Sequence, residues 1–143
     1  MGIIRTSHGS VTFLLITMDV SQLYTSIRDI NGLNACRHFL MVHQVQYLKH
    51  TMMILSMMET CLTDNIFVFE NRHYRQSQGT AVGTSFIPSH GNLFMGWWEE
   101  QVVWIEPMLI YTKRVILWLR YIDDLFIIWR GDEESLKSIP SGT

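Results

Sequence analysis

Three aspartates stand where strongly apolar segments end or are interrupted: Asp19, Asp123 and Asp124. Taken singly, each has an ordinary structural interpretation, because Asp is common in turns and at helix N-caps. The adjacent pair is harder to explain, since neighbouring like charges cost free energy and the tightest hairpin turns prefer Gly where the second carboxylate stands. These residue types therefore indicate that a cation compensates the charge.

A magnesium site would explain the three carboxylates as ligands of one metal centre. Mg²⁺ takes hard oxygen ligands and typically combines one or two carboxylates with substrate phosphates. If Asp19 and Asp123 lie on neighbouring strands, the three carboxylates converge as two-metal phosphoryl transfer requires, with ions roughly 3.5–4 Å apart. The pattern predicts this chemistry at Asp19, Asp123 and Asp124.

The segments around the aspartates predict short strands. Residues 11–18, VTFLLITM, are apolar and β-branched without polar alternation, which is typical of a strand buried on both faces and here ending at Asp19. Residues 116–129 place apolar runs on both sides of Asp123-Asp124, which predicts two strands joined by a two-residue turn at that pair. Neighbouring strands would then carry all three carboxylates.

Two longer segments predict helices that cover one face of the sheet. Residues 37–58 form one helix of about six turns, and residues 88–105 form another that starts at Pro88 and is closed by Pro107. The first helix has one apolar stripe at spacings of three and four: Met41, Val45, Leu48, Met52 and Leu55. The predicted fold class is α+β with a small antiparallel sheet.

The remaining segments predict irregular structure around one further strand. Residues 66–69, IFVF, indicate a short strand, and the polar residues 70–79 lead into a loop with Gly79 and Gly83 as its permissive points. The polar tail from Gly131, and residues 137–143 above all, are expected to fray.

Composition limits the possibilities further. The chain has 143 residues, 48% of them hydrophobic, which predicts one domain with a real core rather than disorder. A net charge of −2 with scattered basic residues argues against gripping nucleic acid by bulk electrostatics. No apolar stretch approaches the roughly 18 residues that span a bilayer, so no membrane association is expected. Cys36 and Cys61 have no zinc-type spacing and are expected to be buried reduced thiols.

Three ordered segments resemble motifs A, B and C of a reverse transcriptase palm. They are DVSQLYTSI at 19–27, QSQGTAVGTSFIPSHGNLFMGWWEE at 76–100 and RYIDDLFIIW at 120–129. They are most similar to the reverse transcriptases of Penelope-like retroelements, in which DVxxLYT and YIDD segments recur. The resemblance spans nearly the whole chain and implies a partial palm at residues 1–136.

The resemblance implies roles for the acidic residues. Asp19 and Asp123 would be ligands of two catalytic Mg²⁺ or Mn²⁺ ions, with Asp124 beside them and the Val20 carbonyl as a further ligand. Tyr24 falls at the position that lies under the sugar of the incoming nucleotide in this family.

The resemblance also implies that Gly79, Gly83 and Pro88 support the primer–template pair and the new base pair.

Two departures from the family pattern stand out. Val82 replaces a usual Met, and His90-Gly91-Asn92 replaces a usual YAN. A Gly in the first turns of a helix costs about 0.5–1 kcal/mol relative to Ala, which suggested degeneration of this helix.

The implied function is RNA-directed DNA polymerisation, with an RNA template, a DNA primer and deoxynucleoside triphosphates as partners, inside the cell and in the nucleus if active. Fingers and thumb segments are not recognisable in the 143 residues, so the isolated chain is expected to bind nucleic acid weakly or not at all and not to extend a primer. One alternative is an inactive retroelement remnant without an enzymatic role. Another is a structural module with an Asp-Asp hairpin, which leaves motifs A and B unexplained.

Overall fold

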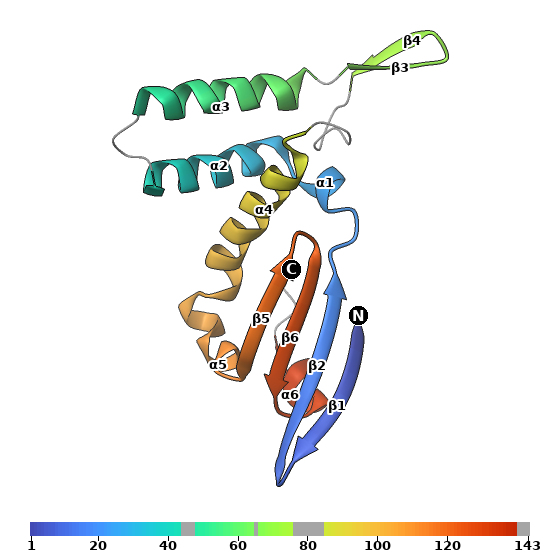
Figure 1. The fold of residues 1–143 in the computed structure, drawn as a ribbon, viewed down its shortest axis with the longest axis vertical. Helices are drawn as coiled ribbons and strands as arrows, with labels where there is room; N and C mark the ends of the chain where they lie inside the picture. Colours follow the sequence, from blue (N-terminus) through green and yellow to red (C-terminus); the bar gives the residue numbers. More distant parts are fainter. Residues whose placement is uncertain (44–47, 65, 76–84, 140–143) are drawn as a thin grey trace. The chain divides into compact units, whose positions relative to one another are not determined.

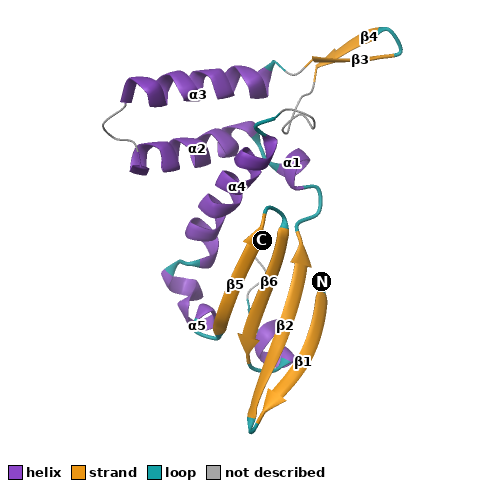
Figure 2. Ribbon diagram, in the orientation of Figure 1, coloured by secondary structure: helices purple, strands orange, loops and turns teal. Residues whose placement is uncertain are grey.

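The computed structural model describes residues 1–43, 48–64, 66–75 and 85–139. The chain divides into two compact units, residues 1–21 with 99–143 and residues 22–98, and each is described by itself. Helices and a small antiparallel sheet are both present (Figure 2), so the predicted α+β class is confirmed. That the helices cover one face of the sheet stays a prediction.

The first unit contains a four-stranded antiparallel sheet in the order β1-β2-β6-β5 (Figure 1). Its strands are β1 (Gly2–His8), β2 (Val11–Asp19), β5 (Val115–Tyr121) and β6 (Asp124–Arg130). The strands predicted around the aspartates are confirmed, whereas β1 was not predicted. Its signal is Gly9-Ser10, because His8 pairs with Val11 and Gly9 has a φ of 62°, as a two-residue hairpin turn requires.

The core of this unit lies on one face of the sheet. Leu14 and Ile16 of β2 are paired with Trp129 and Ile127 of β6, and all four side chains are buried. On the other face of β2, Phe13 and Leu15 are only half-buried and Thr17 is exposed. The prediction that β2 is buried on both faces is therefore wrong, because the described part of this unit packs its core on one face only.

A short helix, α6 (Glu133–Lys137), follows the sheet where a frayed tail was expected. The Asp132 carboxylate caps it by accepting a hydrogen bond of 2.9 Å from the Ser135 backbone N–H, which lowers the pKa of Asp132. Leu136 and Ile139 pack against the core of the sheet. The frayed-tail prediction is wrong as far as Ile139, and residues 140–143 lie outside the described residues.

The second unit contains α1 (Leu23–Ser26), α2 (Asp29–His43), α3 (Leu48–Thr63) and α4 (Ile87–Trp98). The single helix predicted over residues 37–58 is wrong, because this segment is shared by α2 and α3, which pack against each other (Figure 1). The predicted stripe is not one buried face: Leu55 is buried, whereas Met41 and Met52 are exposed. Residues 37–58 contain neither Gly nor Pro, so no residue type marks the break.

The helix predicted over residues 88–105 is confirmed in its first part. It begins at Ile87 with Pro88 in its first turn, and a π-helical turn, η2 (Glu99–Val103), follows α4. Pro107 lies in the 3₁₀ helix η3 (Glu106–Met108), before the short α5 (Leu109–Thr112). The helical run therefore ends at Val103, Trp104 and Ile105 form a bend, and Pro107 lies in a separate 3₁₀ helix beyond it.

A two-stranded hairpin completes the second unit. The predicted strand at residues 66–69 is confirmed as β3 (Ile66–Phe69), and it pairs with β4 (Arg72–Arg75), which occupies the first half of the predicted polar segment. Glu70 and Asn71 form the turn with φ values of 48° and 60°, as a tight hairpin requires. Gly79 and Gly83, predicted to be permissive loop positions, lie outside the described residues.

No helix in the described part of the chain is both long and apolar enough to cross a bilayer. The two cysteines differ from the prediction, because Cys36 of α2 is buried while Cys61 of α3 is exposed. Burial raises the pKa of the Cys36 thiol to about 11 by desolvating its thiolate.

This difference predicts two well-separated thiol reactivities. The thiolate is the nucleophile, so at pH 8 we expect Cys61 to react with a disulfide reagent at least about a hundredfold faster than Cys36. Release of the coloured leaving group, measured before and after adding denaturant, checks this. Cys61→Ser should remove the fast phase alone, and two thiols reacting at one rate in the folded protein would contradict the assignment.

Candidate functional site

Asp19 and Asp124 lie directly opposite each other on the two central strands of the sheet. Asp19 is the last residue of β2 and Asp124 the first of β6, and they are register partners. Beyond them, the Val20 backbone N–H donates a hydrogen bond of 3.0 Å to the Asp123 carbonyl. Side chains opposite each other in an antiparallel pair share a face, with Cβ atoms about 4.5–5.5 Å apart. The predicted neighbouring strands are confirmed.

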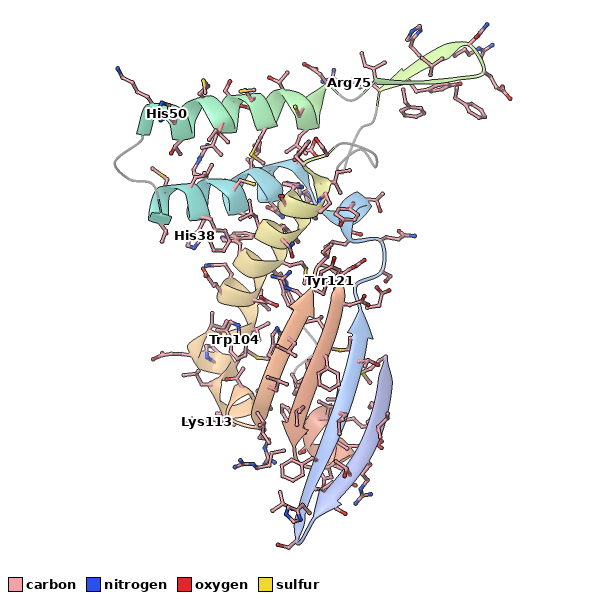
Figure 3. The ribbon with its side chains drawn as sticks, in the orientation of Figure 1. His38, His50, Arg75, Trp104, Lys113 and Tyr121 are labelled. Atoms are coloured by element: carbon pink, nitrogen blue, oxygen red, sulfur yellow. The ribbon has the colours of Figure 1, made fainter. Side chains whose placement is uncertain are left out.

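The turn that carries the acidic pair is shifted by one residue from the prediction. Tyr121 pairs with Asp124, so the two turn residues are Ile122 and Asp123 rather than Asp123 and Asp124 (Tyr121 is labelled in Figure 3). Ile122 has a φ of 55°, which is strained for a β-branched residue and usually belongs to Gly. Asp124 is consequently a strand residue whose side chain has a fixed direction.

The carboxylates border a hollow of about 460 Å³ at this end of the sheet. Its lining comes from all four strands and includes Thr17, Asp19, Leu119, Asp124 and Phe126. The strand register places these five side chains on the sheet face opposite the core. The volume is within the range of about 300–1,000 Å³ that pockets for small molecules have.

The charge at this site has no basic partner in the described part of the chain. No ion pair there involves Asp19, Asp123 or Asp124. Asp19 and Asp124 are exposed and Asp123 is half-buried. Like charges directly opposite in a sheet are destabilising, so this arrangement favours a bound cation.

The donor set fits a hard cation that brings other ligands with it. Among the described residues, no group of three or more His, Cys, Asp or Glu side chains could hold a metal ion, so the predicted convergence of all three carboxylates is not seen. Two opposed carboxylates with a third on the adjoining turn provide only oxygen donors. This set suits Mg²⁺, which keeps waters and takes substrate phosphates as further ligands.

A partly buried ion pair lies on the core face of the same hairpin, and sequence reasoning missed it. The Arg120 Nε lies 2.9 Å from a Glu99 carboxylate oxygen, which also accepts a hydrogen bond of 2.8 Å from the Trp118 indole. Trp104 packs edge-on against Trp118 with ring centroids 5.5 Å apart. The available signal was Arg120 within an apolar strand, since a buried charge requires a partner.

Arg120 also contacts the turn that carries Asp123. Its guanidinium donates a hydrogen bond of 3.3 Å to the Ile122 carbonyl. The strained turn residue is therefore held from the core side by a side chain that is itself fixed by Glu99.

Tyr24 lies in α1 and is half-buried, as an ordinary packing residue or a nucleotide contact would be. Its ring packs against Gly91 of α4, where an added Cβ would lie 2.8 Å from the Tyr24 Cε1 atom. Gly91 therefore makes room for the Tyr24 ring. The departure that suggested a degenerate helix has a structural reason, and Pro88 precedes it in the first turn of the same helix.

His90, the other departure, is buried in the same unit. An added Cβ at Gly32 of α2 would overlap the His90 ring, which also contacts Phe86 edge-on with centroids 5.8 Å apart. Burial lowers the pKa of His90, and the nearby Asp29 carboxylate acts in the opposite direction. His90 is therefore a packing residue whose space comes from Gly32.

The lowered pKa predicts acid sensitivity of the folded chain. Below the ordinary His pKa of 6.5, the unfolded chain gains a proton that the native His90 does not, so stability falls with pH until the native pKa is reached. The slope is at most about 1.4 kcal/mol per pH unit. Urea unfolding between pH 7.5 and 5 checks this, with His90→Gln expected to show a flatter profile. An equally steep profile in that variant would contradict the role of His90.

No protein-family model, curated protein or solved structure matches this chain.

Proposed function

We propose that this chain is the palm region of a retroelement reverse transcriptase, which joins deoxynucleotides to a primer along an RNA template. The observation that carries the proposal is the register that places Asp19 opposite Asp124, with the Asp123 carbonyl bonded to the Val20 N–H. These residues lie about a hundred positions apart in the sequence, yet they meet at one end of the central strand pair. Motifs A and C would bring together carboxylates in this way.

The chemistry would be attack of the primer 3′-hydroxyl on the α-phosphate of a triphosphate, with pyrophosphate leaving. When bound, Mg²⁺ ions supply charge stabilisation to the attacking and leaving oxygens. Asp19 and Asp123 would hold these ions, with Asp124 and the Val20 carbonyl beside them. The open hollow on this face gives the phosphates a place to approach the carboxylates. Most of the protein's contribution is then positioning and charge compensation.

The proposal includes the substrate contacts implied by the resemblance. Tyr24 would stack against the deoxyribose and clash with a 2′-hydroxyl, which is the group that distinguishes ribonucleotides. Its packing against Gly91 supports a fixed position for the ring. Pro88 lies in the first turn of the helix that carries Gly91. By the resemblance, Gly79, Gly83 and Pro88 would support the primer–template pair and the new base pair.

Manganese binding by the 143-residue protein tests the site without requiring polymerisation. Electron paramagnetic resonance measures the free Mn²⁺ signal, which should fall as protein is added and return on competition with Mg²⁺. Removing one carboxylate ligand should weaken binding about tenfold or more in Asp19→Asn and Asp123→Asn. Glu106→Gln, at an exposed acid of η3, is the matched control and should bind as the unmodified chain does.

Two results would contradict the proposal. One is equal Mn²⁺ affinity in the Asp19→Asn, Asp123→Asn and Glu106→Gln variants. The other is no detectable binding even when a deoxynucleoside triphosphate is added to supply the phosphate ligands.

A further inference from the structure

The β3–β4 hairpin exposes apolar side chains on both of its faces. Ile66, Phe67, Val68 and Phe69 are 65%, 52%, 60% and 60% exposed, although all four are strongly apolar. A two-stranded hairpin is marginally stable in water, and a contiguous exposed apolar surface usually marks an interaction site. The hairpin is therefore a candidate interaction surface.

The strand register sorts the hairpin into two different faces. Phe67 pairs with Tyr74 and Phe69 with Arg72, so these four side chains share one face, which we call the aromatic face. The Phe67 and Tyr74 rings stack with centroids 5.6 Å apart and planes 19° apart, and Phe69 lies 6.5 Å from Tyr74. The aromatic face thus presents three adjacent rings beside one guanidinium.

Positive charge is concentrated on one strand of this hairpin. Arg72 and Arg75 both lie on β4, whereas Glu70 in the turn is the single acidic residue of the hairpin. Arg75 attaches the hairpin to the end of α3. Its Nε donates a hydrogen bond of 3.0 Å to the Thr63 carbonyl, and its Nη2 lies 3.5 Å from the Asp64 Oδ1. Figure 3 labels Arg75 at this end of the hairpin. Arg72 is the cation of the aromatic face.

We propose that the aromatic face binds single-stranded nucleic acid. Bases would stack on Phe67, Phe69 and Tyr74, and Arg72 would contact a phosphate. Base stacking on exposed aromatic side chains next to basic residues is the usual mode of sequence-tolerant single-strand binding. This goes beyond the aspartate site and depends on the hairpin alone. It departs from the expectation that the isolated chain binds nucleic acid weakly or not at all, because that expectation considered bulk charge and missing fingers and thumb rather than base stacking.

The arrangement of charge favours a nucleic acid over a second copy of the chain. The register places Arg72 next to Phe69 on the aromatic face and Arg75 next to Ile66 on the opposite face, so a guanidinium borders the apolar positions of each face. The cores of protein interfaces are depleted in charge, and two hairpins meeting face to face would bring β4 cations together. A single strand supplies both phosphates and unstacked bases, whereas a duplex hides its base faces. A net charge of −2 agrees with weak duplex binding.

Fluorescence anisotropy of labelled oligonucleotides tests the proposal with the 143-residue protein at low salt. Oligo(U) and oligo(dT) distinguish RNA from DNA, and a blunt duplex of mixed sequence is the control ligand. We expect single strands to bind tighter than the duplex. Phe69→Leu, which keeps an apolar side chain but loses the ring, should weaken single-strand binding roughly tenfold, and Phe69→Tyr should retain it. Val68→Ala, on the opposite face of β3, is the matched control.

The salt dependence of single-strand binding distinguishes the phosphate contact of Arg72 from base stacking on the aromatic rings. Arg72→Gln should reduce the slope of log K against log salt by about 0.7, the value for one single-strand phosphate contact. Absence of single-strand binding, or equal affinity in Phe69→Leu, Arg72→Gln and Val68→Ala, would overturn the proposal. So would concentration-dependent self-association that Phe69→Leu abolishes, because the face would then be a protein interface.

The two proposals can fail separately. Phe69→Leu should bind Mn²⁺ as the unmodified chain does, since neither Phe nor Leu has a side-chain atom that can ligate a metal ion. Absence of Mn²⁺ binding by the unmodified chain would thus contradict the proposed function but leave the hairpin proposal standing. Absence of single-strand binding would contradict the hairpin proposal but leave the proposed function standing.

Discussion

Asp19→Asn or Asp123→Asn in a complete polymerase that carries these motifs is expected to lower kcat/KM for nucleotide addition at least about a thousandfold, or about 4 kcal/mol of transition-state stabilisation. Each change removes one negative charge that would hold the ions, while the isosteric amide keeps the local packing. Asp124→Asn should be milder, because Asp124 lies beside the proposed ligands. Single-nucleotide primer extension under steady-state conditions measures all three variants.

The structure provides the controls for this experiment. Glu106→Gln removes an exposed acid of η3 and should leave kcat/KM unchanged within about twofold. Thermal unfolding of each variant separates lost chemistry from lost folding, and removing one of two opposed carboxylates should leave stability equal or higher. Similar activity in Asp19→Asn, Asp123→Asn and Glu106→Gln would show that the assigned roles are wrong.

Disrupting the partly buried Glu99–Arg120 pair should produce a large loss of stability. Both side chains are only 14% exposed, and Glu99 also accepts the Trp118 hydrogen bond. Arg120→Met would leave the Glu99 carboxylate largely buried without its cation, which should lower the free energy of unfolding by about 3 kcal/mol. Urea unfolding followed by tryptophan fluorescence measures this change.

Two further variants test whether the stability lost in Arg120→Met comes from a carboxylate left without its cation. The double variant Glu99→Leu with Arg120→Met should be more stable than Arg120→Met alone, because it removes the uncompensated charge as well. The exposed pair Asp64–Arg75, 65% accessible on both sides, is the contrast: Asp64→Asn should cost less than about 1 kcal/mol. Equal losses in Arg120→Met and Asp64→Asn would contradict the distinction.

The sequence by itself determined where several elements lie. Apolar β-branched runs located β2 and β6, because such residues fill a half-buried pleated surface, and an apolar run also located β3 although its side chains are exposed. Pro88 located the start of α4, since its ring fits the first turn of a helix. These signals are local, so no information about distant residues was needed. The break between α2 and α3 was missed because regular apolar spacing can continue across two helices.

The sequence also identified the acidic residues, since charge at the end of an apolar run is a local feature. Only the tertiary structure decided how they are arranged. The turn at Ile122-Asp123 leaves Asp124 in β6 as the register partner of Asp19, whereas a turn at Asp123-Asp124 would have placed neither aspartate in a strand. A shift of one residue in a hairpin reverses the face of every side chain, and residue types alone do not determine that register.

Contacts between distant segments were likewise decided by the tertiary structure. Glu99 meets Arg120 across 21 positions, and Gly91 and Gly32 provide space for the rings of Tyr24 and His90. Side chains can accommodate one another in this way only after the elements have packed, because packing density and the pairing of buried charge depend on neighbours that lie far apart in the chain.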